Sequence, residues 1–400
     1  MQKPHTILSR FRIQYLFLLG GTALLALLLL FRLGSLTYGN AAPIEATTAA
    51  AALDWHTILA NPLNAPYLVV KLLVRLSGHD GITSLRLISV VFAGLAAMLF
   101  YLVARGWHNT RVALLATWLF VSSGWFLHVA RLGSPEILWI VSILAIVVLL
   151  SPNRNGRQTW LALPSTLAIL SIVLYVPGMV WLVLAGLLLR RKNIAEAWTA
   201  TKVLWLRIVS VLFSIILLIP LVRALTLQPS LILHWLGLPG SSSLSDVSIS
   251  SVGHNIVNVP LGLLLHSEFD AAHWLGTLPL LSSFEIAMLA LGVYFYATHM
   301  RAARTRLIVA LAVVAVLLAG IIGVLGISLI VPVVYLLLAA GIAYILRLWL
   351  QVFPNNPVAR SIGILVILFA VLLTSIYQTR SYFVAWRYSP ETSRAFQIKL

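Results

Sequence analysis

Two short segments of the sequence concentrate side chains that could carry acid–base or electrostatic chemistry. The first holds one carboxylate, Glu45, in the run Pro43-Ile44-Glu45-Ala46. The second runs from His128 to Glu136 and includes Arg131. A carboxylate in a dry setting can act as a general base, and a fixed arginine can stabilise negative charge that develops during a reaction. These segments therefore predict a site where a proton is removed beside an anion.

Each segment also has a purely structural interpretation. Glu45 could be a hydrated acid near a helix N-terminus, where negative charge is favoured. The run Ser134-Pro135-Glu136 has the pattern of a helix start, with a capping serine, a first-turn proline and a first-turn acid. Arg131 could reach for the membrane interface with its long side chain. Both interpretations stay open from the residues alone.

Further polar residues could bind a phosphate or a metal ion. Lys71, Arg75 and Arg86 are expected near the ends of two neighbouring helices, where they could hold a lipid phosphate or simply contact lipid head groups. The run His266–His273 contains two histidines and two acids, but its spacing matches no established metal motif. The chain has no cysteine, which excludes disulfides and thiolate sites.

Long apolar runs must position these residues. Hydrophobic residues make up 61% of the chain and charged residues only 9%. Many runs approach the roughly 20 residues with which a helix crosses the ~30 Å core of a bilayer, and soluble helices need a polar face that these runs lack. The expected fold is a single all-α membrane domain over residues 1–400, a polytopic bundle of about 11 transmembrane helices. The clearest runs are Tyr15–Leu30, Leu85–Val103, Val112–Val129, Ile137–Leu150, Val203–Leu221, Leu307–Leu325 and Ile362–Ile376.

The charge distribution predicts how the chain is oriented. The formal net charge is +17, with 27 lysines and arginines against 10 acids. Basic residues gather on the cytoplasmic side of membrane proteins, so the excess points to the membrane and not to a nucleic-acid partner. Lys3, Arg10 and Arg12 precede the first run, which we interpret as an uncleaved anchor. We expect a multi-pass protein of the plasma membrane with a cytoplasmic N-terminus and most acids outside.

Three polar stretches are then expected on the outer face. They are a first loop over 34–84, a second loop over 226–280 and a C-terminal tail over 378–400. In the first loop, Glu45–Leu53 predicts a short surface helix and Pro66–Leu76 an amphipathic helix lying in the interface. Trp160–Leu189 predicts two short helices separated by Pro177-Gly178. The glycines at 320, 323 and 326 indicate close helix packing or a flexible helix end.

The order of these features resembles a known family. After the first run come Pro43-Ile44-Glu45-Ala46, Asp54-Trp55 and Asn64-Ala65-Pro66-Tyr67-Leu68, then Ser84-Leu85-Arg86-Leu87-Ile88-Ser89 and Ala130-Arg131-Leu132-Gly133-Ser134-Pro135-Glu136. Together they look like the N-terminal half of GT-C glycosyltransferases of the protein mannosyltransferase and aminoarabinose transferase type. The resemblance covers about residues 10–150, and beyond them only Trp274-Leu275-Gly276-Thr277-Leu278-Pro279 is similar.

The resemblance implies an enzyme that takes a sugar from a polyprenyl-phosphate donor at the outer face of the membrane. Glu45 would act as the base that activates the acceptor, and one displacement at the anomeric carbon would invert it. Arg131, with Arg86 or Lys71, would stabilise the leaving phosphate, and His128 would line the same site. Glu136 would position the sugar or share a divalent cation with Glu45. The acceptor could be a protein, a lipid or a glycan.

Two other classes of protein fit the sequence. The acidic pair of the family is reduced here to Ile44-Glu45, so the chain could be a catalytically silent relative that binds lipid carriers or acts as a scaffold. It could also be a transporter of lipid-linked sugars, although transporters commonly show internal repeats and mid-membrane polar sites, and neither is evident here.

Overall fold

In the computed structural model, the described residues are 20–37, 39–151, 162–189, 191, 195, 198–199, 201, 203–238, 249–265, 271–274 and 278–399. The regular structure of these residues is helical, apart from one isolated β-bridge between Ala41 and Ile398. Five helices are long and apolar enough to cross a membrane, or six if one bent pair counts as a span. The expected all-α multi-pass membrane protein is confirmed at this level.

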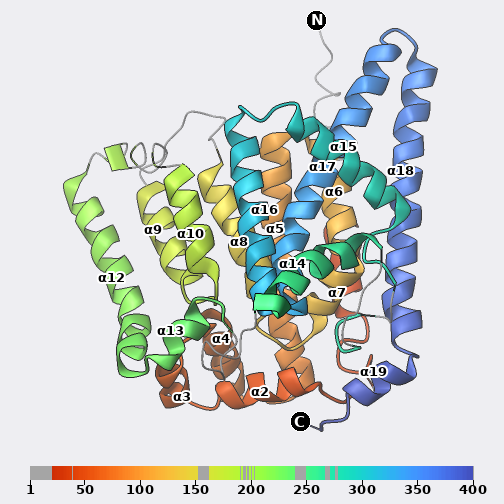
Figure 1. Cartoon of the computed structure of the whole chain (residues 1–400). Coiled ribbons are helices and arrows are strands. Elements are labelled where there is room, and N and C mark those ends of the chain that lie inside the picture. Colours follow the sequence, from red (N-terminus) through yellow and green to blue (C-terminus); the bar gives the residue numbers. More distant parts are fainter. Residues whose placement is uncertain are drawn as a thin grey trace, which may run out of the picture.

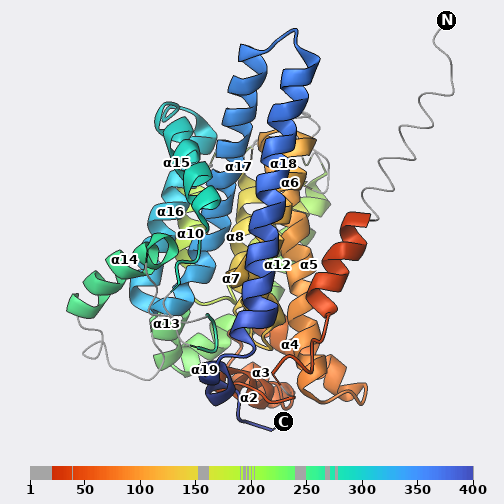
Figure 2. The ribbon, with the colours of Figure 1, turned by 90° about the vertical axis from the view of Figure 1, so that its right-hand side faces the viewer.

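The membrane-crossing helices stand side by side in one bundle (Figures 1 and 2). The long ones are α5 (Ile82–Trp107), α12 (Leu204–Leu227), α16 (Ala303–Ile322), α17 (Ile327–Val352) and α18 (Pro357–Arg380). The bent pair is α6 (Thr110–Ser122) with α7 (Gly124–Arg131). Shorter apolar helices are Gly20–Leu30, α8 (Ile137–Leu150), α9 (Ala162–Val173), α10 (Met179–Leu189) and α15 (Ser283–Ala297).

The core of the bundle lies around α17. In its most apolar stretch 72% of residues are buried, against 22% for α12 and 28% for α18. All three are similarly apolar, so the difference reflects position: α17 is enclosed by protein, whereas α12 and α18 turn their side chains to the lipid. The closest pair is α15 and α17, where a Cβ on Gly292 or Gly341 would collide with the backbone of the other helix. Small residues let membrane helices approach in this way.

Several predicted local elements are confirmed. The first loop forms α2 (Pro43–Ala51), α3 (Trp55–Ala60) and α4 (Ala65–Leu76), which include both helices expected there. The turn at Pro177-Gly178 separates α9 from α10, and Gly178 has the positive φ of +77° that favours glycine. Gly323, with φ of +82°, ends α16, and a Cβ on Gly320 would collide with Ile256.

The third predicted span is bent. The chain over Val112–Val129 turns by 63° between α6 and α7 at Ser123, and the two helices together are apolar enough to count as one span. Gly124 allows the bend because a side chain there would overlap the Trp274 ring, and its N–H donates to Gln378 at 3.3 Å. As a result His128 and Arg131 lie on helix α7, although we expected the whole segment His128–Glu136 to form a turn between two spans.

The second loop and the C-terminal tail contain more structure than expected. In 226–280, α12 continues to Leu227, and α13 (Ser230–Trp235) and α14 (Ile249–Leu264) follow, with α14 packed on α16. The tail begins within α18, continues in a π-helical turn over Ser381–Trp386 and ends after α19 (Pro390–Ala395). Tyr382, Trp386 and Phe396 are buried, because they pack against α7 and α5.

Candidate functional site

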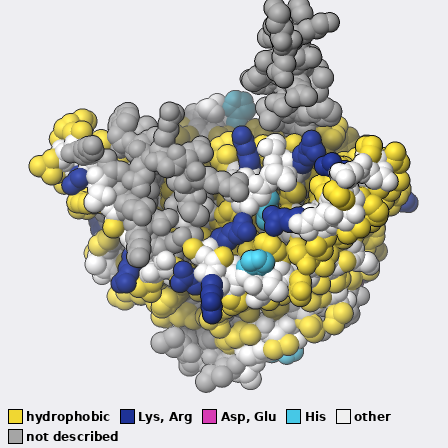
Figure 3. All heavy atoms as spheres, turned by 90° about the horizontal axis from the view of Figure 1, so that it is seen from above, with side chains coloured by type: hydrophobic (Ala, Val, Ile, Leu, Met, Phe, Trp, Pro, Cys, Tyr) yellow, Lys and Arg dark blue, Asp and Glu magenta, His cyan; other side chains and the backbone are white. Residues whose placement is uncertain are grey.

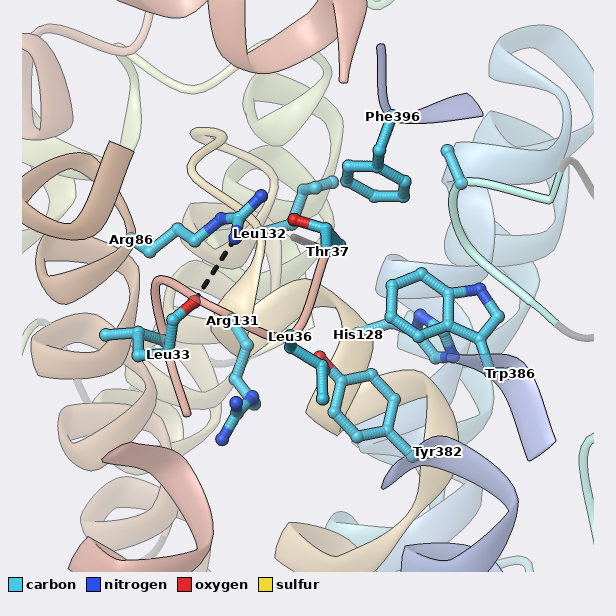
Figure 4. A pocket seen from close by; sticks show the side chains of 11 residues that line it. Leu33, Leu36, Thr37, Arg86, His128, Arg131, Leu132, Tyr382, Trp386 and Phe396 are labelled. Atoms are coloured by element: carbon cyan, nitrogen blue, oxygen red, sulfur yellow. Dashed lines mark hydrogen bonds between the residues drawn. The ribbon is translucent and has the colours of Figure 1, made fainter. Parts of the chain in front are cut away.

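The candidate site lies at one end of the bundle, where the first loop, α7 and the C-terminal segment meet (Figure 4). Its central cavity is small, about 10 Å³, which is room for about one water molecule. Its charged lining residues are two arginines, Arg86 and Arg131, and most of the rest of its wall is aromatic or aliphatic. The positive charge of the arginines makes the cavity suited to an anion. The lining residues are Leu33, Leu36, Thr37, Arg86, His128, Arg131, Leu132, Ala272, Tyr382, Trp386 and Phe396.

Glu45 and Arg86 form a fully buried ion pair beside this cavity. Arg86 Nε donates to Glu45 Oε1 at 2.8 Å, and Arg86 Nη2 donates to Oε2 at 2.9 Å. The N–H groups of Gly133 and Ala42 donate to the same two oxygens at 2.8 and 2.9 Å. Each carboxylate oxygen thus accepts two hydrogen bonds. Glu45 is exposed by 0%, so this carboxylate is closed to a substrate in this arrangement.

The local fold explains why Glu45 is held there. It occupies the third position of α2, where a carboxylate can reach back to the N–H at the start of the helix. Arg86, from the first turns of α5, also donates to the carbonyl oxygens of Leu33 at 3.2 Å and Asn40 at 3.0 Å. One guanidinium therefore joins α5, the end of the first helix and the start of α2.

Arg131 caps the first helix. Its Nη1 donates to the carbonyl oxygens of Leu28 and Leu29 at 2.8 and 2.9 Å, and its Nη2 donates to that of Phe31. A cation is favoured at a helix C-terminus, where the last carbonyls lack partners within the helix. The guanidinium also lies over the Phe383 ring at 4.8 Å. Arg131 forms no ion pair with an acid in the described part of the chain, so it brings uncompensated positive charge to the site.

His128 sits in an aromatic enclosure one turn before Arg131. Its ring meets those of Tyr382 and Trp386 edge-on, with centroids 4.6 and 4.5 Å away, and the Trp274 ring lies at 5.7 Å. The sequence placed His128 near Arg131 but gave no reason to expect aromatic neighbours from the far end of the chain.

Glu136 differs from Glu45 in its surroundings. It is also buried, but neither of its oxygens has a hydrogen-bond partner among the residues described. The imidazole Nε2 of His273 lies 3.5 Å from Oε1. His273 in turn stacks on Trp125 at a centroid distance of 6.1 Å. Glu136 is thus the candidate carboxylate that retains the capacity to accept a proton.

Lys71 belongs to a neighbouring cavity, not to this one. Its Nζ donates to Asp80 at 2.6 Å, and Arg75 Nε lies 3.2 Å from the other oxygen of Asp80. The hydrogen bond from Lys71 holds the pKa of Asp80 below its ordinary value. This cavity, of about 290 Å³, has small side chains of α2 as its other wall. The structure therefore unites Glu45, Arg86, Arg131, His128 and the turn that carries Glu136, and it leaves Lys71 apart.

Sequence reasoning missed the contribution of the C-terminal segment. Tyr382, Trp386 and Phe396 line the cavity, and Phe396 lies 5.9 Å from the Arg86 guanidinium. The one feature of the sequence that could have indicated this is the number of aromatic residues in the tail 378–400, which otherwise looks polar. Glu285 was not singled out either; it is buried and accepts a hydrogen bond from Tyr335 at 2.6 Å.

The described residues do not fit a divalent cation. They include no group of three or more acids and histidines placed to hold one, and Arg86 already neutralises Glu45. Much of the His266–His273 run lies outside the described residues. Comparison with known proteins adds no identity: no protein family and no curated protein matches this chain.

Proposed function

We propose that this protein is a membrane glycosyltransferase that moves a sugar from a polyprenyl-phosphate donor to an acceptor at the outer face of the membrane. One observation carries the proposal. Three of the segments that resemble the GT-C enzymes are far apart in sequence, yet they meet through Glu45, Arg86 and Gly133 in one hydrogen-bonded cluster. Arg131 and Glu136 flank Gly133, so an uncompensated cation and a proton-accepting carboxylate belong to the same site.

Glu136 is the better candidate for the base. A base needs a lone pair that a substrate hydroxyl can reach, and the oxygens of Glu45 each accept two hydrogen bonds already. Those of Glu136 accept none among the described residues; they are buried as well, so an acceptor reaches them only when the site opens. In our proposal Glu136 takes the proton of the acceptor hydroxyl as its oxygen attacks the anomeric carbon. Glu45, which the sequence predicted as the base, positions Arg86 and the 132–136 turn.

Arg131 supplies the charge that the leaving group needs. When the bond from the anomeric carbon to the phosphate oxygen breaks, the electron pair leaves with the polyprenyl phosphate, and a fixed cation stabilises it. The charge of Arg86 is balanced by Glu45, whereas that of Arg131 is not balanced by an acid in the described chain. The rings of Tyr382 and Trp386 offer flat apolar faces of the kind that pack against sugar rings.

The proposed enzyme has about 11 spans with its N-terminus in the cytoplasm. The five long helices, the bent pair α6–α7 and the five shorter apolar helices of the described chain support that number. With this orientation the candidate site faces outward in the plasma membrane, on the side where we expect the lipid-linked donor and a protein, lipid or glycan acceptor. No step through a metal ion is included, because the site residues do not fit one.

A catalytically silent protein that binds a lipid carrier is the second candidate. The specific observation in its favour is that the cavity holds only about 10 Å³ and that Glu45 and Arg86 neutralise each other. The two functions differ in one respect that can be measured: both retain the donor, but only the enzyme releases its sugar.

The test is sugar release from a radiolabelled polyprenyl-phosphate sugar by the purified full-length chain. We expect the wild type to release the sugar and Glu136→Gln to lose about 100-fold or more in rate, the range that general base catalysis supplies. Glu136→Gln should still bind the donor and unfold at the same temperature. The exposed acid Glu391 gives the control, and Glu391→Gln should release sugar at the wild-type rate. Donor retained without release in the wild type would favour the silent protein, and no donor binding would overturn both.

A further inference from the structure

The end of the bundle opposite the candidate site carries only positive charge on its described surface. Viewed from this side, Figure 3 shows lysine and arginine side chains but no acidic ones among the residues that it colours. This is the end where α5 stops, α16 begins and the α17–α18 turn projects (Figure 2). Such a surface attracts anionic lipid head groups. Its exposed arginines are Arg105, Arg111, Arg301, Arg306, Arg347 and Arg360.

A cavity of about 220 Å³ opens within this surface. The last turns of α5 and α8 and the first turn of α16 enclose it. Most of its wall is apolar, and Arg304 provides the cation. Leu102 and Gly106 on α5 are exposed, so the cavity opens to the outside of the bundle. The lining residues are Leu102, Val103, Gly106, Trp107, Val148, Ser151 and Arg304.

Arg304 is fixed at this cavity by its neighbours. Its Nη1 donates to the carbonyl oxygen of Trp107 at 3.0 Å, and its guanidinium lies 5.7 Å from the centre of the Phe295 ring. Trp107 is itself held by a hydrogen bond from its Nε1 to Ser151 at 3.1 Å. No acid pairs with Arg304 in the described chain. A positioned cation without a counter-charge is what a phosphate group requires.

We propose that this cavity binds an anionic phospholipid from the adjoining membrane leaflet. Arg304 would hold the phosphate, and the exposed apolar side of α5 at Leu102 would carry the first part of an acyl chain. A lipid fits better than a free phosphate because the wall is mostly apolar and opens where membrane helices end. An anionic lipid fits better than a zwitterionic one because the surrounding described surface has cations without acids.

Titration of the purified full-length chain with phosphatidylglycerol or phosphatidylcholine tests the proposal, with bound lipid counted by native mass spectrometry. We expect the wild type to retain phosphatidylglycerol in preference to phosphatidylcholine. Arg304→Gln should lower the retention of phosphatidylglycerol about fivefold, since one basic residue near a charged lipid is worth about 1 kcal/mol. Arg306 is exposed on the same helix, and Arg306→Gln should change retention by less than about twofold, within the smaller effect of a solvated charge.

A second pair of variants tests the cavity without changing any charge. A Cβ on Gly106 or on Gly94 meets no atom within 4 Å, so either position of α5 accepts a side chain. Gly106 lines the cavity and Gly94 does not. Gly106→Phe should therefore displace phosphatidylglycerol, and Gly94→Phe should not.

Three outcomes would overturn the proposal. Equal retention of the two lipids by the wild type would remove its basis. Equal losses in Arg304→Gln and Arg306→Gln, or full retention by Gly106→Phe, would show diffuse attraction to the charged surface. Displacement of the lipid by an excess of soluble glycerol phosphate would show that the cation alone binds and that the apolar wall has no part.

Discussion

Glu45 and Arg86 form an ion pair that joins several segments of the candidate site. Both side chains are removed from solvent, and each has further hydrogen bonds to the backbone of a different segment. Removing one member of such a pair leaves the other charge buried and uncompensated, which is costly. Glu45 is therefore expected to matter first for the stability of the site.

Substitution of Glu45 tests this expectation. Glu45→Gln keeps the shape of the side chain but removes its charge, and we expect it to lower the free energy of unfolding by about 3–5 kcal/mol. Arg86→Gln should cost a similar amount, and the double variant should cost less than the sum of the two, because the residues are coupled. Thermal unfolding in detergent, followed by tryptophan fluorescence, measures the changes. A loss from Glu45→Gln no larger than that from Glu391→Gln would contradict the role.

Asp80 predicts a small dependence of stability on pH. The hydrogen bond from Lys71 lowers the pKa of Asp80 in the folded chain below its ordinary value of 3.8. The pair therefore contributes its full stability above pH 3.8, and the contribution is lost as the pH falls through the lower folded pKa. Because Asp80 is half exposed, the contribution should be at most about 1 kcal/mol.

The Asp80 contribution can be measured against Asp80→Asn. The unfolding temperature of the wild type should exceed that of the variant at neutral pH, and the difference should disappear in strong acid. A difference that stays constant from neutral to strongly acidic pH would show that the ionised carboxylate of Asp80 is not its source.

At the level of single residues, the sequence predicted which side chains gather but not what each one does. Glu45, Arg86 and Arg131 were expected in one site, and the structure places them around one cavity and its wall. Their pairing could not be predicted, because Glu45 and Arg86 are separated by 41 positions and either could have faced a ligand. The same limit applies to Arg131, whose hydrogen bonds go to backbone carbonyls, which no side-chain pattern records.

At the level of elements, the C-terminal segment covers the candidate site, and we expect it to limit access. Within the described part of the chain, few hydrogen bonds tie its end to the first loop. They are the two of the Ala41–Ile398 bridge, with N···O distances of 2.7 and 3.2 Å, and one from the Asn40 side-chain amide to the Phe396 carbonyl oxygen. The Phe396 ring covers Arg86. The cavity beneath is too small for a sugar, so under the proposed function we expect this segment to move when a substrate enters.

A single cysteine can report this movement, because the chain has none of its own. Thr37 lines the cavity and is 6% exposed, so Thr37→Cys should react slowly with a polar maleimide. Adding Phe396→Ala should raise the rate of maleimide labelling about tenfold or more. A tenfold rise corresponds to a loss of about 1.4 kcal/mol in the free energy that keeps the segment closed over the cavity. The matched control is Phe353→Ala, an aromatic residue in the turn at the other end of the bundle.

The maleimide experiment has a clear contrary result. An unchanged rate in Phe396→Ala, and again in a chain truncated after Ser389, would show that the segment does not limit access. Size-exclusion chromatography of each variant checks that a faster rate does not come from unfolding.

The elements themselves were largely predictable because the length of an apolar run fixes whether it can span a bilayer. The expected break at Pro177-Gly178 was visible for a local reason, since proline and glycine end helices. The bend at Ser123 was not, because its cause is distant: Gly124 packs against Trp274 and donates to Gln378. The burial of the tail could not be predicted for the same reason, since its aromatic residues Tyr382 and Trp386 pack against His128 of α7, far away in the sequence.

At the scale of the whole molecule, charge separates the two ends of the bundle. The described acids Glu45, Asp54 and Asp80 lie in or beside the first loop, at the end of the candidate site. Arg304 and the six exposed arginines named above for the opposite surface lie at the other end, where Figure 3 shows no acidic side chain among the residues that it colours. Basic residues remain on the cytoplasmic side during insertion, so this asymmetry predicts that the candidate site is external and the proposed lipid cavity internal.

Two cysteine positions decide this orientation. Ser77, between α4 and α5, and Asn355, between α17 and α18, are both exposed and lie at opposite ends. In intact cells or right-side-out vesicles, a membrane-impermeant maleimide should label Ser77→Cys at once and Asn355→Cys only after permeabilisation. The reverse pattern would place the candidate site in the cytoplasm, where lipid-linked sugars of the outer leaflet could not reach it. Labelling of both from outside would contradict the membrane-spanning arrangement itself, because α5 and α18 could not then both cross the bilayer.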